Sequence, residues 1–309
     1  MARVSLQILG FLGGVAAQLQ YTSTKSSAVA AAAATALTLS PTSTVAGKTF
    51  DRYIQIFLEN TDYSKAIADP SLAYLASQGI SLTNYFAITH PSQPNYVAAV
   101  GGNTFGITDD SFQRISSSTK TVVDLLDTAG ISWGIYQEHS PYTGFQANWK
   151  NQVSGADDYV RKHNPLISYD SVTSDINRLA KSKNFTQFDK DLAANKLPQW
   201  MFITPNMTND GHDTSITVSG KWSRNFLTPL LSNPKFNIDR TLIVLTFDEG
   251  STLGTNQIYS VLLGSAVPSA KIGTTNSTKY NHYSLIKTAE LNWNLGSLGQ
   301  NDVAASAFF

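Results

Sequence analysis

The sequence predicts an α/β domain with a mainly parallel central sheet flanked by helices. Three apolar runs of strand length, rich in β-branched and aromatic residues, lie at residues 53–58, 200–204 and 241–247. Continuous runs of this kind are typical of strands buried on both faces. Helical patterns separate the runs, and such an alternation favours a parallel sheet with helices on both sides.

The remaining elements follow from turn and cap signals. Asp69-Pro70 should begin a helix over residues 71–77, and Pro94 suits the first turn of a helix that includes residues 96–100. The other expected strands are residues 131–136 and 258–263. The other expected helices are residues 122–126, 175–197 with a break near Asn184, 222–231, and 284–295. Residues 140–169 show no clear period, which predicts a long loop or a cap over a site.

Polar side chains follow several expected strands at their carboxyl ends. They lie at residues 59–62 (ENTD), 210–213 (DGHD) and 248–249 (DE). Ligands of open α/β sheets bind beyond these strand ends, so we expect the three clusters to converge on one edge. Each cluster alone could equally be a solvated loop or a helix cap. Two adjacent acids are costly to bring together unless a cation or water screens them.

Residues 90–96 (HPSQPNY) place one hydroxyl between two prolines, where a Pro-rich turn could simply start a helix. Ser92 is expected just ahead of the helix, where free N–H groups and the macrodipole favour a phosphate. Oxygen ligands such as Glu59 and Asn60, with some imidazole, suit Mg, Mn, Ca or Zn. Such a metal would lower the pKa of a serine hydroxyl and make it a nucleophile. A Ser-His-Asp hydrolase would need glycines where Ser92 has prolines.

The histidines and one basic segment offer further candidates. His90 lies two residues before Ser92, and His212 could be a metal ligand or a proton donor. Residues 161–165 (RKHNP) could reach the negative charge of a substrate or form an ordinary solvated surface. His282 precedes the expected helix cap Ser284, and packing beside that cap would explain it equally well.

The amino-acid composition limits the kinds of binding partner and chemistry that we expect. The formal net charge is zero and 14% of the residues are charged, which argues against nucleic acid or an anionic membrane as the main partner. The chain has no cysteine, which excludes disulfides and thiolate chemistry. Residues 1–17 are expected to be a signal peptide, although a frayed helix would also fit, and residues 18–46 a low-complexity, disordered segment. Three sequons, at Asn184, Asn206 and Asn276, are compatible with glycosylation after secretion.

Several motifs, taken in order, are similar to those of the fungal secreted, phosphate-repressible acid phosphatases. These belong to a phosphoesterase family that includes bacterial phosphatidylcholine-type phospholipases C. The resemblance covers residues 47–309, which we interpret as the catalytic domain. Its motifs are residues 59–63 (ENTDY), 90–96 (HPSQPNY), 162–165 (KHNP), 204–207 (TPNM), 210–213 (DGHD), 247–249 (FDE) and 282–284 (HYS).

This resemblance implies an alkaline-phosphatase-like fold and hydrolysis of phosphate esters. Ser92 would be the phosphorylated nucleophile, and Asn95 would bind the phosphoryl group. The implied metal ligands are Glu59, Asn60, Asp248 and Glu249. The implied substrate, acid or metal residues are His212, Asp213 and His282. Phospholipase relatives share much of this pattern, so it does not separate monoesters from diesters.

The sequence therefore predicts a secreted, metal-dependent acid phosphatase that acts on small-molecule phosphate monoesters through a phosphoseryl intermediate. His212 would protonate the leaving oxygen, since a histidine can hold a proton at mildly acidic pH. The residues expected near the substrate are His90, Asn95, Lys162, His163, Asp213 and His282. The cofactor would be a divalent metal ion of unspecified identity, with no nucleic acid or stable membrane partner. The alternatives are a phosphodiesterase or phospholipase C and a non-catalytic secreted glycoprotein, which would leave the acidic strand ends unexplained.

Overall fold

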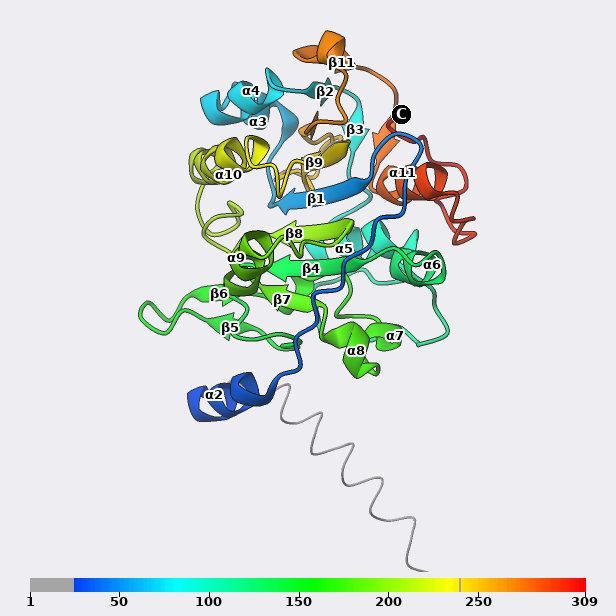
Figure 1. Cartoon of the computed structure of the whole chain (residues 1–309). Helices are drawn as coiled ribbons and strands as arrows, with labels where there is room; N and C mark the ends of the chain where they lie inside the picture. The colour runs from blue at the N-terminus through cyan, green and yellow to red at the C-terminus, as the bar shows by residue number, and fades with distance from the viewer. Residues whose placement is uncertain (1–24, 239) are drawn as a thin grey trace, which may run out of the picture.

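An eight-stranded sheet lies at the centre of the structure, and it confirms the predicted α/β fold class (Figure 1). The structure is a computed structural model that describes residues 25–238 and 240–309. The expected signal peptide at residues 1–17 lies outside the described residues. The strand order is β11-β2-β10-β9-β1-β8-β4-β7, and β10 runs antiparallel to both of its neighbours while the other pairs are parallel.

The strands of this sheet are mostly those that the apolar runs predicted. Every residue of β1 and β9, the two strands at its centre, is buried. The eight strands are β1 (Arg52–Leu58), β2 (Ile80–Leu82), β4 (Trp133–Gln137), β7 (Ser182–Asn184), β8 (Trp200–Thr204), β9 (Thr241–Phe247), β10 (Ser260–Leu263) and β11 (Thr274–Asn276). Two small pairs lie outside it, β3 (Tyr85–Phe86) with β12 (Tyr280–Asn281) and β5 (Trp149–Lys150) with β6 (Asp157–Tyr159).

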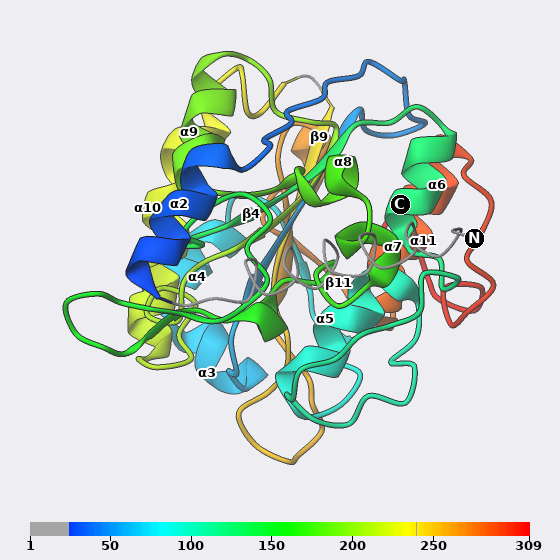
Figure 2. The same ribbon diagram turned by 90° about the horizontal axis from the view of Figure 1, so that it is seen from below.

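Helices cover both faces of the sheet, as the view from below shows (Figure 2). One face carries α3 (Tyr63–Ala68), α4 (Pro70–Ala76), α9 (Phe185–Ala193) and α10 (Ile216–Leu231). The other carries α5 (Ser92–Gly101), α6 (Val122–Thr128) and α11 (Tyr283–Trp293). The short helices are α7 (Asp170–Thr173), α8 (Ile176–Leu179), η1 (Arg161–His163) and η2 (Ser269–Lys271).

Some boundaries differ from the prediction for local reasons. The helix expected over residues 175–197 is interrupted by β7, because that short segment pairs with the edge of the sheet at β4. Asn184 then caps α9 by accepting a hydrogen bond from the Gln187 N–H. The segment 140–169 contains the β5–β6 hairpin and η1 rather than loop alone. The cap residue of α11 is His282, not Ser284.

Residues 25–46, for which composition predicted disorder, form helix α2 (Ser26–Thr35) and an extended strap over the domain. Val29 and Ala32 of this helix belong to a small buried cluster with Tyr142, Phe145 and Tyr159. In the strap, Ser43 Oγ donates to the Gln199 side-chain oxygen at 2.6 Å. Hydrogen bonds of small polar side chains hold the strap, and low hydropathy does not reveal them.

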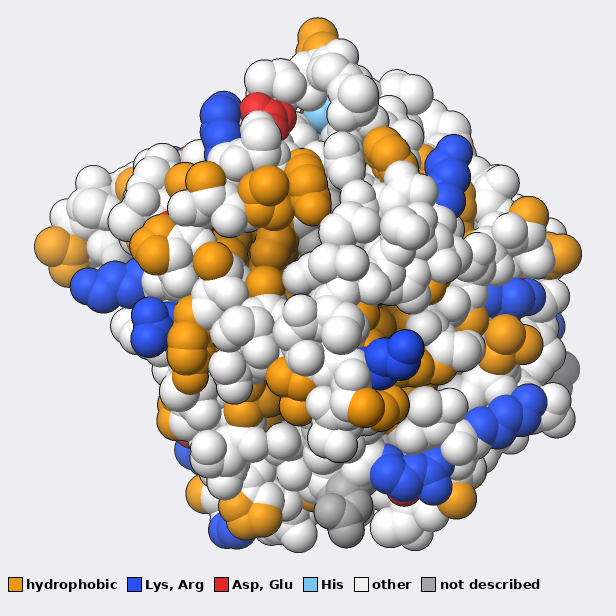
Figure 3. Space-filling model, turned by 90° about the horizontal axis from the view of Figure 1, so that it is seen from above, with side chains coloured by type: hydrophobic (Ala, Val, Ile, Leu, Met, Phe, Trp, Pro, Cys, Tyr) orange, Lys and Arg blue, Asp and Glu red, His pale blue; other side chains and the backbone are white. Residues whose placement is uncertain are grey.

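The surface seen from above carries Lys and Arg side chains scattered among hydrophobic and uncharged ones (Figure 3). Among the described helices, we find none that combines the length and the apolar character needed to cross a bilayer.

Candidate active site

The acids of the site follow the two central strands of the sheet. β1 and β9 pair in parallel with Leu58 opposite Phe247, so Glu59 and Asp248 leave the sheet side by side at the same edge. The Asp248 N–H donates to the Leu58 carbonyl at 2.9 Å, which extends the pairing by one residue. Both acids are fully buried. The convergence of polar clusters expected from the sequence is therefore present at this edge.

Ser92 reaches these acids from α5. It is the first residue of that helix rather than the residue ahead of it, and it is buried. Its Oγ lies 3.1 Å from Glu59 Oε2 and 3.2 Å from Glu249 Oε1. The Asn60 side-chain oxygen lies 3.5 Å away. The structure thus brings the Ser92 hydroxyl within hydrogen-bonding distance of acids from both central strand ends.

The Asn60 amide lies among the carboxylates and can be turned in two ways. With its nitrogen towards them, it donates to Asp248 Oδ1 and Glu59 Oε2 at 3.1 Å and to Glu249 Oε1 at 3.2 Å. With its oxygen towards them, it adds a neutral oxygen ligand to the carboxylates and the hydroxyl. Asp248 Oδ2 is buried without a hydrogen-bond partner among the described residues. The donor set is what a hard divalent cation takes.

Burial and mutual repulsion hold these acids back from ionising. Burial raises the pKa of Asp248 to about 6. Burial and then the charge of Asp248 raise the pKa of Glu249 to about 9. Burial, followed by Asp248 and Asp210, raises the pKa of Glu59 well above its usual range. A cation would relieve this repulsion, so Glu59, Asn60, Asp248 and Glu249, the four predicted ligands, fit a divalent metal.

A second group of ligand-type side chains shares Glu59 with the first. Ligand atoms of Glu59, His163 and Asp210 all lie within 4.8 Å of one another. Glu59 Oε1 accepts a 2.5 Å hydrogen bond from the Tyr96 hydroxyl and lies 3.2 Å from His163 Nε2. Burial is the largest cause that lowers the pKa of His163 well below its usual range. A neutral imidazole can bind a metal, so this group is a second candidate cation site.

Two residues of this second group were not predicted as site residues. Asp210 stands in a polar cluster after β8, the signal that identified Glu59, and it could have been found in the same way. Tyr96 lies in an apolar run of α5 and gives no signal, because its hydroxyl acquires a role only through the packing of α5 against β1.

His90 contacts the acids next to Ser92. Its Nδ1 lies 2.5 Å from Glu249 Oε2. Burial lowers the pKa of His90, and burial followed by the charge of Asp248 raises the pKa of Glu249, so both shifts favour the neutral forms of the two groups.

Lys162 brings a positive charge to the edge of the site. Its Nζ lies 2.8 Å from Asp110 Oδ2, and Asp110 Oδ1 accepts from the Gln93 N–H at 2.9 Å. Asp110 therefore ties η1 to the first turn of α5. Burial alone would lower the pKa of Lys162, but Glu59 and Asp110 outweigh it and raise the pKa. The ammonium group consequently stays charged near the acids.

His212 and Asp213 lie at the exposed side of the site. His212 Nδ1 is 2.7 Å from Asp213 Oδ1, which leaves Nε2 for a ligand. The rings of His212 and His163 have centroids 5.8 Å apart. His212 therefore stands next to the candidate metal ligands while facing solvent.

Two predicted substrate residues have supporting positions instead. The Asn95 side-chain oxygen accepts from the N–H groups of Ile88 and Thr89, and its nitrogen donates to the Thr89 carbonyl. His282 is fully buried, and its Nε2 lies 2.6 Å from the Asp248 carbonyl oxygen. Neither is open to a substrate: Asn95 shapes the loop before Ser92, and His282 holds the end of β9.

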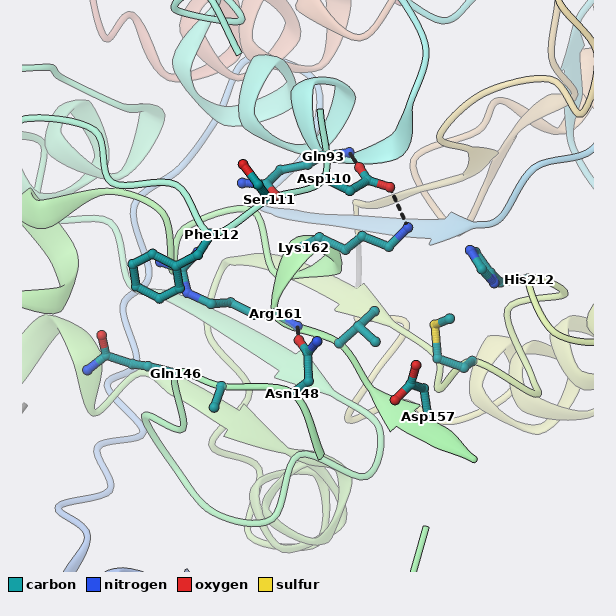
Figure 4. Close-up of a pocket in the computed structure, with 13 residues that line it drawn as sticks. Gln93, Asp110, Ser111, Phe112, Gln146, Asn148, Asp157, Arg161, Lys162 and His212 are labelled. Carbon is teal, nitrogen blue, oxygen red and sulfur yellow. Dashed lines mark hydrogen bonds and ion pairs between the residues drawn. The ribbon is translucent and has the colours of Figure 1, made fainter. Parts of the chain in front are cut away.

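A cavity of about 510 Å³ opens beside these side chains. Figure 4 shows Gln93, Lys162 and His212 around it, together with Phe112 and Arg161. A volume of this size suits a small organic ligand.

A family model described as the phosphoesterase family matches residues 62–296. The chain belongs to the phosphoesterase family. The chain is 56% identical over 282 residues to an acid phosphatase of Aspergillus fumigatus, covering 91% of this chain and 63% of that protein. It is 51% identical over 304 residues to a phosphate-repressible acid phosphatase of Penicillium chrysogenum, covering 97% and 73%. This phosphoesterase therefore spans less than two thirds of the Aspergillus protein.

Solved structures support the fold of this phosphoesterase. A protein in the alkaline phosphatase superfamily from Vibrio parahaemolyticus superposes with a TM-score of 0.56 at 10% identity, covering 94% of this chain and 79% of that one. The expected alkaline-phosphatase-like fold is thereby confirmed.

Proposed function

We propose that this phosphoesterase hydrolyses phosphate monoesters at acidic pH, with Ser92 as nucleophile and a divalent metal ion as cofactor. The placement of Ser92 Oγ, 3.1 Å from Glu59 Oε2 and 3.2 Å from Glu249 Oε1, carries the proposal. The acid phosphatases among its relatives support the reaction and the pH range. We also propose that the protein is secreted, as the sequence at residues 1–17 favours.

In the first step the Ser92 hydroxyl gives its proton to Glu249, which is ionised when the cation is bound, and Oγ forms a bond to phosphorus while the ester P–O bond breaks. His212 donates a proton to the leaving oxygen, and the Asp213 carboxylate holds its ring. Lys162 attracts the negative phosphoryl group to this edge of the sheet. In the second step His212 takes a proton from a water molecule and the water oxygen bonds to phosphorus while the bond to Oγ breaks. Glu249 returns its proton to Ser92 Oγ as phosphate leaves.

The metal, when bound by Glu59, Asn60, Asp248 and Glu249, would lower the pKa of a hydroxyl ligand and offset negative charge on the phosphoryl oxygens. We place the cation in this oxygen set because it contains the nucleophile. The set of Glu59, His163 and Asp210 is the alternative position, and metal analysis of Asp248→Asn and Asp210→Asn separates the two. We expect Asp248→Asn to lose the bound metal and Asp210→Asn to retain it.

The serine is tested by Ser92→Ala, assayed with p-nitrophenyl phosphate across acidic pH. We expect a loss of at least about 1000-fold in kcat with the circular dichroism spectrum unchanged. Acid quenching of the unaltered enzyme with radiolabelled substrate should leave label on Ser92. Full activity in Ser92→Ala would refute the mechanism.

The proton donor is tested by His212→Gln with two monoesters that differ in leaving group. An alkyl phosphate needs a proton on its leaving oxygen more than p-nitrophenyl phosphate does. We therefore expect the variant to lose about 100-fold or more on the alkyl ester and much less on the nitrophenyl ester. Equal losses on both esters would remove His212 as the proton donor.

The choice of monoester over diester is tested by comparing p-nitrophenyl phosphate with bis-p-nitrophenyl phosphate and a choline phospholipid. The charge of Lys162 near the acids favours the monoester, which presents three phosphoryl oxygens where a diester presents two. A higher kcat/KM on either diester would favour the phosphodiesterase or phospholipase C alternative.

A further inference from the structure

Phe112 lines the cavity of the site without belonging to the hydrophobic core. Its ring is 58% exposed, whereas a large aromatic side chain is usually mostly buried. The close-up places it on the cavity wall, away from the Lys162 and His212 end (Figure 4). An exposed aromatic ring inside an active-site cavity can bind a ligand by stacking.

Arg161 holds this ring from one side. The guanidinium carbon lies 4.2 Å from the centroid of the Phe112 ring. Arg161 is itself only 5% exposed, and it donates to the Ile167 carbonyl at 2.6 Å and to Ser168 Oγ at 3.3 Å. The cation behind the ring is therefore fixed by the fold. A ring supported in this way loses little freedom when a ligand stacks on it.

The ring is also fixed relative to the reaction centre. Asp110, two residues before Phe112, pairs with Lys162 and accepts a hydrogen bond from the Gln93 N–H, next to Ser92. Arg161 in turn precedes Lys162 in η1. Two short segments thus connect the ring with the nucleophile. Gln93, the neighbour of Ser92, and His212, the proposed proton donor to the leaving oxygen, both line this cavity. We therefore expect the leaving group of an ester bound at Ser92 to extend into it.

The wall also offers a polar group. The Gln146 side chain lines the cavity, and within the described part of the chain it has no hydrogen-bond partner. A ligand with polar atoms on the rim of a ring could use both Phe112 and Gln146.

We infer that the cavity is a leaving-group subsite that selects planar aromatic groups by stacking on Phe112. This inference rests on the proposed function, because it says which residues bind the leaving group of the same phosphate ester. Arylated phosphates and nucleoside monophosphates share the required planar ring. A saturated ring of equal size fills the same volume but presents no flat face to Phe112.

The subsite is tested by calorimetric binding of three non-hydrolysable phosphonates to the metal-loaded protein. Methylphosphonate is the reference, since it is too small to reach the ring. Phenylphosphonate should bind about 10-fold more tightly than cyclohexylphosphonate, the size-matched saturated control. Phe112→Leu should reduce this ratio to below about 2, whereas Phe112→Tyr should keep it. Val153→Ala, at an exposed residue outside the cavity, is the control variant.

The outcomes separate the two claims. If methylphosphonate binds but the phenyl-to-cyclohexyl ratio is near 1, or survives in Phe112→Leu, the aromatic subsite is refuted and the proposed function stands. If no phosphonate binds and no monoester is hydrolysed, the proposed function itself fails. A ratio near 10 that falls only when the aromatic ring is removed supports the subsite.

Discussion

Among the described residues, two groups of buried charged side chains are built in opposite ways. In the first, Lys183 Nζ lies 2.8 Å from Asp191 Oδ2, which also accepts a 2.7 Å hydrogen bond from the Tyr136 hydroxyl. Gln187 donates to the other oxygen of Asp191 at 2.7 Å. Burial alone would raise the pKa of Asp191, but the bonds from Lys183 outweigh it and lower the pKa. In this group the buried negative charge is balanced by a buried positive charge and by hydrogen bonds.

The second group is the candidate active site, where Glu59, Asp248 and Glu249 lie around Ser92. Here burial raises the pKa of all three acids, and neighbouring carboxylates raise the pKa of Glu59 and Glu249 further. No side-chain cation within the described residues makes a direct ion pair with Asp248. Lys162, whose charge lowers the pKa of all three acids, pairs directly with Asp110 instead. The difference indicates that the first group stabilises the fold by itself, while the second needs a cation to be complete.

The largest expected effect is on activity, and it should separate the two groups. Glu249→Gln removes a proton acceptor and a metal ligand, so kcat/KM for p-nitrophenyl phosphate should fall at least about 100-fold. Asp191→Asn, assayed at a temperature where it remains folded, should stay within about 3-fold of the unaltered protein. A loss in Asp191→Asn as large as that in Glu249→Gln would break the comparison.

The next effect is on the free energy of unfolding, and here the substitution of Asp191 should have a large effect. Asp191→Asn leaves the buried Lys183 ammonium without its counter-charge, which should cost about 3–5 kcal/mol of unfolding free energy. Urea unfolding measures this cost. The double variant Lys183→Met with Asp191→Leu should recover most of it, because an apolar pair leaves no unpaired charge. Equal stability of Asp191→Asn and the unaltered protein would contradict the structural role.

Stability of the metal-free protein should fall as pH rises. The pKa of Glu249 in the folded state is about 9, against an ordinary value of 4.5. Between these values the folded state keeps a proton that the unfolded state releases, so each pH unit costs up to about 1.4 kcal/mol per such proton. Thermal unfolding at a series of pH values measures the slope. Glu249→Gln should flatten it, and an unchanged slope would show that Glu249 ionises normally.

The smallest expected effect concerns an acid pair away from the site. Burial and then Asp302 raise the pKa of Glu290 to about 7. As for Glu249, the folded state keeps a proton that the unfolded state releases. The free energy of unfolding should therefore fall as pH rises from about 4.5 to 7. Glu290→Gln should remove that pH dependence, which is up to about 1.4 kcal/mol for each pH unit between these values, and should leave metal binding unchanged. If metal affinity falls in Glu290→Gln, the acids of the site are not a separate unit.

The sequence predicted the parts of the structure that have local signals. The apolar runs of β1 and β9 identified the central strands, and their polar ends identified Glu59 and Asp248. The prolines around Ser92 identified the start of α5. These features need only the order of residues along one segment.

Several features made by contacts between distant segments were not predicted, although the convergence of the polar strand ends was. The Tyr96 hydroxyl meets Glu59 only after α5 packs on the sheet. His282 and Asn95 resemble substrate residues in sequence, but in the fold Asn95 bonds to backbone groups and His282 to the Asp248 carbonyl and the Tyr85 hydroxyl. The order of residues 25–46 depends on partners such as Gln199, more than 150 residues away in the chain.

The central claim is that the acids around Ser92 are incomplete without a divalent cation. Calorimetric titration of the metal-free protein with Zn²⁺, Mn²⁺, Mg²⁺ and Ca²⁺, repeated in buffers of different ionisation enthalpy, measures both affinity and proton release. We expect at least one of these ions to bind with release of about one proton or more at pH 6, because Glu249 must ionise on binding. Asp191→Asn should behave in the same way, and Glu249→Gln should bind more weakly and release fewer protons. Absence of binding by all four ions, or binding without proton release, would contradict the account.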